Sequence, residues 1–202
     1  MTKIIDISFP KASATPILGN MVLEAIRYKA GSLQILNQLK LPHQEEYDEV
    51  KNAEDGWHAI KDMRTRGAPA IAIVAALSLA VELLNTKTSD DAEEVKVYIL
   101  EKLRYLVTSR PTAVNLADAA RKLEKIVTNS AAKERSTGAD VSKAYCDAAA
   151  QMLIDDVSDN QAIGKHGAKW ITKKAGGGQV SVLTHCNTGY VAMSPIIFDF
   201  VC

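Results

Sequence analysis

The sequence lacks the features that mark several large classes of protein. Its three cysteines, Cys146, Cys186 and Cys202, form no Cys-x-x-Cys pair, and its four histidines share no ligand spacing, so we predict no metal site. A sparse, odd cysteine count fits a reducing compartment. Basic and acidic residues both number 24, which gives zero net charge and argues against nucleic-acid binding through bulk charge.

The first twenty residues match no targeting signal. No continuous apolar run follows the first lysine, which argues against a secretory leader, and the segment has no arginine, which argues against a mitochondrial one. Pro10, Pro16 and Gly19 interrupt it, and Met21 is an alternative start. We therefore expect residues 1–20 to be a flexible extension.

Strand-like and then helical patterns fill the next part of the chain. Residues 23–28 and 33–39 alternate loosely around a turn, which predicts an antiparallel β-hairpin, with a third strand near 47–50. Apolar residues at helical spacing then predict six helices, within residues 54–64, 69–84, 95–106, 113–127, 141–152 and 163–171. Trp57, Ile60 and Met63 share one face of the first helix, and Trp57 and Trp170 are expected in the core, whereas the acidic residues at 90–94 are expected to be solvated. The helix at 69–84 is apolar nearly all round. At sixteen residues it is too short for a bilayer, so we predict a central buried helix and no membrane association.

Three glycines, Gly176–Gly178, end the helical region and predict a linker. Val180–Cys186 then has the pattern of a buried parallel strand that turns polar at its carboxyl end. The predicted fold class is α+β to α/β. A small amino-terminal antiparallel β-hairpin plus helical domain over 21–175 precedes the first strand of a truncated Rossmann-like α/β domain over 179–202.

Cys186 is a candidate reactive group because ligands bind at the carboxyl ends of strands in open α/β sheets. A helix that begins after Gly189 would favour its thiolate. The alternative is an inert, buried small hydrophobe. His185 would point to the opposite face of the strand, so no Cys–His pair is predicted.

Two arginines come just before predicted helices. Arg66, Gly67 and Ala68 precede Pro69, which suits the first helical turn because its missing N–H is not needed there. Free amides beside an arginine make an anion site. Arg110 repeats this arrangement at the next junction between helices, where residue 111 or 112 is expected to begin the second helix. The alternatives are a plain helix start with solvated arginines and an ordinary interhelical turn.

Four motifs taken together are more specific than any one of them. They are Leu-Glu-Ala-Ile-Arg-Tyr at 23–28, Arg-Gly-Ala-Pro-Ala at 66–70, Ser-Arg-Pro-Thr-Ala-Val-Asn at 109–115 and Leu-Thr-His-Cys-Asn-Thr-Gly at 183–189. In this order they closely resemble the methylthioribose-1-phosphate isomerase family, which shares a superfamily with the regulatory subunits of translation initiation factor 2B. The resemblance runs from about Met21 to Gly189, the amino-terminal half of the family's sequence.

The resemblance implies conversion of 5-methylthioribose 1-phosphate to 5-methylthioribulose 1-phosphate in methionine salvage, without metal or organic cofactor. It implies that Arg66, Gly67, Ala68 and Arg110 bind this sugar phosphate and that Cys186 stabilises the transition state. It also implies a homodimer in the full-length family and a cytoplasmic, and also nuclear, location. The alternative function is a non-catalytic regulatory or binding subunit related to translation initiation factor 2B. A third is a fragment that dimerises with a full-length copy.

After Gly189 the sequence departs from the family's glycine-rich run, and Pro195 disfavours a continued helix. The family's catalytic aspartate, a substrate-binding glutamine and an Asn-Lys pair belong to its second half. We therefore expect a truncated chain that is inactive alone. Residues 196–201 are apolar and β-prone, which predicts a tendency to aggregate.

Overall fold

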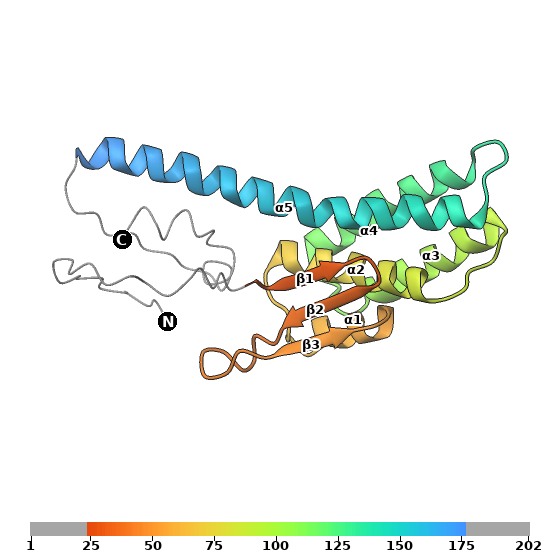
Figure 1. Ribbon diagram of the computed structural model, residues 1–202, viewed down its shortest axis with the longest axis horizontal. Helices are drawn as coiled ribbons and strands as arrows, with labels where there is room; N and C mark the ends of the chain where they lie inside the picture. The colour runs from red at the N-terminus through yellow and green to blue at the C-terminus, as the bar shows by residue number, and fades with distance from the viewer. Residues whose placement is uncertain (1–23, 177–202) are drawn as a thin grey trace. The chain divides into compact units, whose positions relative to one another are not determined.

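A computed structural model describes residues 24–176 (Figure 1). The described elements are β1 (Ile26–Lys29), β2 (Ser32–Leu36), β3 (Tyr47–Val50), α1 (Ala53–Lys61), α2 (Ala68–Asn85), α3 (Ala92–Val107), α4 (Val114–Ala131) and α5 (Gly138–Ala175). Ala25–Asp156 form one compact unit, and the rest of α5 belongs to another. The predicted strand at 180–186 and the predicted extension at 1–20 lie outside the described residues.

The three strands form one antiparallel sheet in the order β1–β2–β3, as the amino-terminal pattern predicts. Ile26 pairs with Ile35 and Leu33 with Val50. Gly31, with a φ of 80°, makes the turn between β1 and β2, where a backbone conformation that favours glycine is needed. Alternate residues of β2 point into the core, so the sheet covers the helices with one face. The small antiparallel sheet with a mostly helical remainder confirms the first part of the predicted fold class.

The buried helix predicted at 69–84 is α2, and it lies at the centre of the core. α1, α3 and α4 and the strand β2 all pack against it. The argument from length was wrong, because α2 has 18 residues and is long and apolar enough to cross a membrane by composition alone. Burial distinguishes a membrane-spanning helix from a core helix better than length does. Of this stretch, 72% is buried inside the structure, as in the core helix of a globular protein.

The apolar stripes predicted for α3 and α4 are confirmed. Every member of the α3 stripe is buried, as are three members of the α4 stripe; these residues are Val95, Ile99, Leu103, Leu106, Leu116, Leu123 and Val127. The acidic residues before α3 are more than a solvated run. Asp91 caps this helix, and its carboxylate accepts hydrogen bonds from the amides of Glu93 and Glu94 at 2.8 and 2.9 Å.

The two helices predicted within 141–171 are one helix, α5. The polar residues between the two stripes contain no proline, so they continue the helix as an exposed segment rather than break it. The interpretation of Trp170 as a core residue was wrong for the described environment, because this side chain is 63% exposed. Gly176, with a φ of 58°, follows the end of α5, where a helix-terminating glycine is common.

Candidate functional site

The first arginine-bearing turn, residues 62–67, follows directly from the end of α1. The amides of Arg64 and Thr65 both donate to the carbonyl oxygen of Ala59, at 3.0 and 3.3 Å, which folds the chain back onto α1. Met63 was predicted on the buried face of a longer helix. This was wrong, because α1 ends at Lys61 and Met63 takes a φ of 62° with its side chain 42% exposed.

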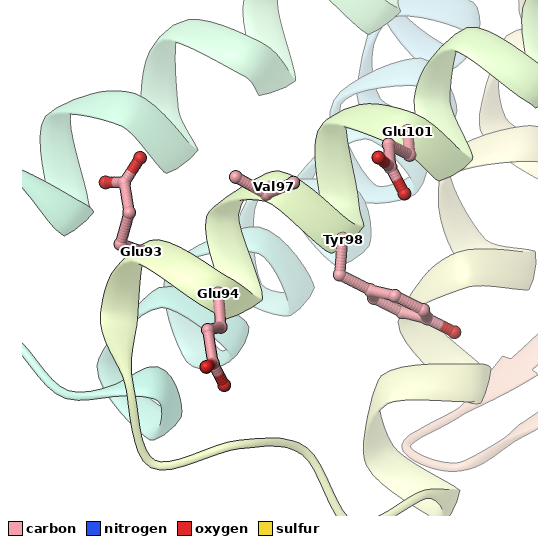
Figure 2. A pocket seen from close by; sticks show the side chains of 5 residues that line it. All are labelled: Glu93, Glu94, Val97, Tyr98 and Glu101. Atoms are coloured by element: carbon pink, nitrogen blue, oxygen red, sulfur yellow. The ribbon is translucent and has the colours of Figure 1, made fainter.

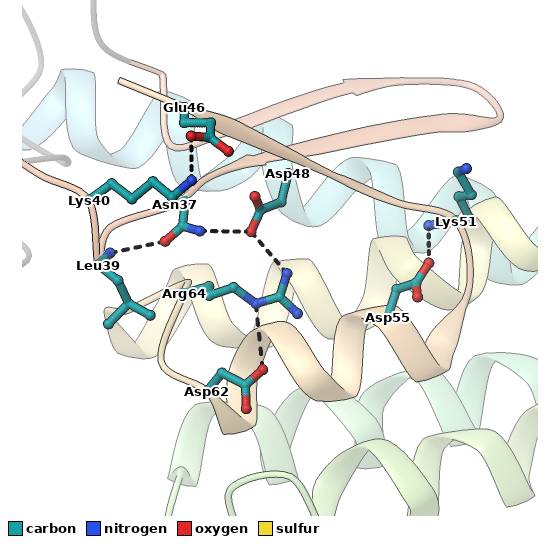
Figure 3. Close-up of polar contacts among 9 residues, drawn as sticks. All are labelled: Asn37, Leu39, Lys40, Glu46, Asp48, Lys51, Asp55, Asp62 and Arg64. Atoms are coloured by element: carbon teal, nitrogen blue, oxygen red, sulfur yellow. Dashed lines mark hydrogen bonds and ion pairs between the residues drawn. The ribbon is translucent and has the colours of Figure 1, made fainter. Parts of the chain in front are cut away.

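Arg64 ties this turn to the sheet (Figure 3). Its guanidinium donates to the carboxylate of Asp48 on β3 at 2.9 Å, and the same oxygen accepts from the Asn37 side chain at 3.0 Å. The Arg64 carbonyl accepts from the amide of Gln38 at 2.9 Å. Arg64 and Asp48 are both largely buried, so the idea that the arginines of this stretch are merely solvated is wrong for Arg64.

Arg66, Gly67 and Ala68 lie where this turn enters α2. Gly67 has a φ of 97° and no side chain caps the helix, while Pro69 lies in the first turn and has no N–H. The amides of Ala68 and the residue after Pro69 therefore have no carbonyl partner within the helix. Arg66 is partly buried, and its Nε donates to the Met63 carbonyl at 3.1 Å. The predicted start of a helix is confirmed, and its bare amino end beside a cation favours an anion.

The second arginine lies in the turn between α3 and α4. The Arg110 amide donates to the Val107 carbonyl at 3.3 Å, and the Arg110 carbonyl accepts from the Ala113 amide at 2.9 Å. Ser109 is buried, and its hydroxyl donates to Leu106 at 2.6 Å. The start of α4 was predicted at residue 111 or 112. It begins instead at Val114, so Arg110 belongs to a defined turn before the helix.

A contact from α1 reaches the second turn as well. The indole Nε1 of Trp57 donates to the hydroxyl of Thr108 at 2.9 Å, and the ring stacks on Tyr105 with 5.7 Å between centroids. Both arginine-bearing turns are therefore attached to one short helix, although they lie more than forty residues apart in sequence. No sequence pattern indicated this contact, because its two partners are separated by 51 residues.

α1 is itself fixed to α2 at two points. The buried carboxylate of Glu82 accepts from the Ala53 amide at the start of α1, at 2.6 Å. Gly56 lies so close to Ser78 that a Cβ built on the glycine would meet the serine Oγ at 2.3 Å. Only glycine allows this approach of the two helices.

Glu82 is the one charged side chain within the apolar face of α2, and hydrogen bonds keep it ionised. Burial alone would raise its pKa. Donation from the Tyr98 hydroxyl, the Ala53 amide and the Lys102 ammonium, the last at 3.0 Å, outweighs burial and places the pKa below its usual value. With three donors in place, this carboxylate serves as a structural cap for α1 and has no free acceptor role to offer a substrate.

Two hollows on the described residues do not suit a sugar phosphate. One, of about 340 Å³, lies on the outer face of α3, where Glu93, Glu94 and Glu101 surround Val97 and Tyr98 (Figure 2). The other, of about 290 Å³, lies between the amino-terminal part of α3, the end of α2 and the loop that follows α2. Carboxylates line the first hollow without any cation and outnumber the single cation, Lys87, in the second, which disfavours a phosphate. Neither hollow includes Arg66 or Arg110.

Cysteine and metal chemistry are both limited within residues 24–176. There, no group of three or more His, Cys, Asp or Glu side chains could hold a metal ion. Cys146 lies on α5, and burial, with a smaller contribution from Asp147, raises the pKa of its thiol to about 11, so it is not a nucleophile. Cys186, the predicted reactive cysteine, lies outside the described residues. Within them, α1 contacts each of the two arginine-bearing turns.

A profile of the Initiation factor 2 subunit family matches residues 64–198. This range contains Arg66, Arg110 and Cys186. The chain belongs to this family. The sheet and the whole of α1 precede the matched range, so the family pattern begins in the turn after α1.

Two curated relatives of high sequence identity are named methylthioribose-1-phosphate isomerase. The methylthioribose-1-phosphate isomerase of Pyrenophora tritici-repentis is 65% identical over 175 residues, which make up 85% of this chain and 45% of the relative. That of Aspergillus terreus is 58% identical over 180 residues, 86% of this chain and 48% of the relative. The chain thus spans about half the length of these relatives.

Two crystal structures share the fold of the described region. The 5-methylthioribose 1-phosphate isomerase from Pyrococcus horikoshii OT3 aligns with a TM-score of 0.66 and 28% identity, over 74% of this chain and 41% of that one. The translation initiation factor eIF-2B, subunit delta, from A. fulgidus aligns with a TM-score of 0.63 and 30% identity, over 73% and 42%. The fold alone therefore does not separate the isomerases from the initiation-factor subunits.

Proposed function

We propose that this chain carries the phosphate-binding part of a methylthioribose-1-phosphate isomerase, which converts 5-methylthioribose 1-phosphate to 5-methylthioribulose 1-phosphate. The observation that carries the proposal is the 65% identity to the Pyrenophora tritici-repentis isomerase over 175 residues. The second candidate, a regulatory subunit related to translation initiation factor 2B, is supported by the likeness to the delta subunit, which is 30% identical.

The proposed chemistry begins with a sugar whose anomeric oxygen carries phosphate, so its ring does not open freely to an aldehyde. Binding the phosphate dianion fixes this end of the substrate and offsets its charge. Arg66, the bare start of α2 and Arg110 supply cation and N–H donors of the right kind. Cys186 is proposed to stabilise the transition state as hydrogen moves between carbons 1 and 2.

The proposal is tested in a chimera, because the chain spans about half the length of its relatives. Residues 1–189 are joined to the second half of the Pyrenophora tritici-repentis isomerase, and formation of the ketose is followed by ¹³C NMR. The chain of 202 residues is assayed beside it and is expected to be inactive. A chimera that folds but neither binds nor converts the sugar phosphate, and instead associates stably with initiation-factor subunits, favours the second candidate.

Substitutions in the chimera assign the roles. Arg110→Ala is expected to raise the Michaelis constant roughly ten- to a hundredfold, the range for loss of a charged hydrogen bond. Arg104→Ala is the matched control, since this exposed arginine lies on the last turn of α3. Cys186→Ser is expected to lower turnover at least about a hundredfold with binding retained. Turnover within a few-fold of the parent would remove Cys186 from the mechanism.

Assembly and location follow from the same proposal. A homodimer is expected for the complete protein, and light scattering on the chimera measures it. We place the protein in the cytoplasm and the nucleus, without membrane or nucleic-acid partners, which fluorescent tagging of the chain in cells tests.

A further inference from the structure

We infer that Trp57 is a positioning residue, which holds the Arg110 turn at a fixed place relative to the Arg66 turn. The inference deepens the proposed function and rests on it, because that proposal directs both arginines to one sugar phosphate. What the structure itself supplies is a single side chain of α1 that bonds to the turn before Arg110.

The Trp57 contact is directional rather than simple packing. The Thr108 hydroxyl donates its own proton to the Tyr105 carbonyl at 2.6 Å, so its oxygen is free to accept from the indole Nε1 at 2.9 Å. The indole plane lies 17° from that of Tyr105, and the edge of the His58 ring meets it at 82°. These two ring contacts orient the indole, and the hydrogen bond fixes Thr108, two residues before Arg110.

The Arg66 turn is also attached to α1, at Ala59, two residues after Trp57. The Ala59 carbonyl accepts from the amides of Arg64 and Thr65, which leads the chain to Arg66. A helical segment between Trp57 and Ala59 is stiff, and Glu82 and Ser78 hold this helix against α2. The spacing of the two arginine-bearing turns is therefore set by α1 and does not depend on the loops that contain them.

Three variants separate positioning from packing. Trp57→Phe keeps an aromatic ring on Tyr105 but removes the donor. Thr108→Val removes the acceptor at an exposed position, while Thr108→Ser restores it, so both Thr108 variants are expected to fold. If Trp57 served only to fill space, Trp57→Phe would leave the turn before Arg110 unchanged, whereas Thr108→Val also removes the Thr108 bond to the Tyr105 carbonyl.

The first measurement is hydrogen exchange on the full chain of 202 residues without ligand. Trp57→Phe and Thr108→Val are expected to speed exchange of the Arg110 and Ala113 amides about three- to tenfold, the factor for loss of one neutral hydrogen bond. Thr108→Ser is expected to stay within twofold of the parent. Unchanged exchange in Trp57→Phe and Thr108→Val overturns the inference, whatever the ligand measurements show.

The second measurement is calorimetric titration of the chimera, which supplies the family's second half, with 5-methylthioribose 1-phosphate. Trp57→Phe and Thr108→Val are expected to weaken binding about three- to tenfold, whereas Thr108→Ser and Arg104→Ala keep it within twofold. Equal affinity of Trp57→Phe and the parent overturns the positioning role. Absence of binding by the parent, or equal affinity of Arg110→Ala, overturns the proposed function instead, while the exchange result still decides whether Trp57 fixes the turn.

Discussion

Gly56 is the position where the contact between α1 and α2 can be tested most directly. In Gly56→Ala the new methyl group would lie 2.3 Å from the Oγ of Ser78 and 2.5 Å from its Cβ. The Ser78 hydroxyl is held by a 2.8 Å hydrogen bond to the Ala75 carbonyl, and its Cβ is fixed to the backbone of α2. The side chain cannot swing away, so the two helices must separate.

The expected cost follows from two opposing terms. Overpacking of a core costs about 1–3 kcal/mol, and the fixed Cβ of Ser78 places this case near the upper end. Replacing glycine by alanine within a helix returns about 1 kcal/mol. We therefore expect Gly56→Ala to lower the free energy of unfolding by about 2 kcal/mol.

Urea denaturation followed by circular dichroism measures this loss. With a slope of about 2 kcal/mol per molar urea, the midpoint should fall by about 1 M. Gly167→Ala is the control, because a Cβ there meets no atom within 4 Å and should be neutral or stabilising by up to about 1 kcal/mol. The double variant Gly56→Ala with Ser78→Gly should lose less than the sum of the single losses. Equal stability of Gly56→Ala and Gly167→Ala would refute the close helix contact.

Three further predictions concern titration, reactivity and metal. The pKa of Glu82 is lower in the folded chain than its unfolded value of about 4.3, so its ionised form stabilises the fold above that pH. The free energy of unfolding of the parent should exceed that of Glu82→Gln by less and less as the pH falls through the folded pKa. A constant difference between the two from pH 7 to pH 3 would contradict this. At pH 8 iodoacetamide should modify Cys146 on the order of a hundredfold more slowly in the native chain than in urea, as peptide mass spectrometry would show. Dialysis against EDTA should leave the activity of the chimera unchanged, and a loss restored by added metal would refute the expectation of no cofactor.

Most of the fold was predictable because burial is periodic. The α3 stripe and the alternation in β2 appear in the sequence as regular spacings, since one face of each element is buried. The continuity of α5 was not predictable in this way. A helical segment without a buried face leaves no apolar period, and the polar residues around Asp155 resemble a loop in composition alone.

The candidate site was predictable only in its local parts. Glycine and proline at residues 67 and 69 mark the start of α2, and this signal is contained within a few residues. The contacts that fix the two turns join distant residues: Arg64 pairs with Asp48 across 16 positions, and Trp57 bonds to Thr108 across 51. Such pairs depend on the tertiary arrangement of elements, which a single sequence does not show.

The two buried polar residues of α2, Ser78 and Glu82, have one physical role in common, and it concerns the arginine-bearing turns. Glu82 caps the first turn of α1, and Ser78 receives Gly56 from the middle of that helix. Burying a charge and a hydroxyl in an apolar helix is unfavourable unless each has partners, and both have them. Apolar residues would have filled this space more favourably but could not have bound the α1 amide. The placement of α1, and through it of Arg66 and Arg110, therefore accounts for the two polar exceptions on α2.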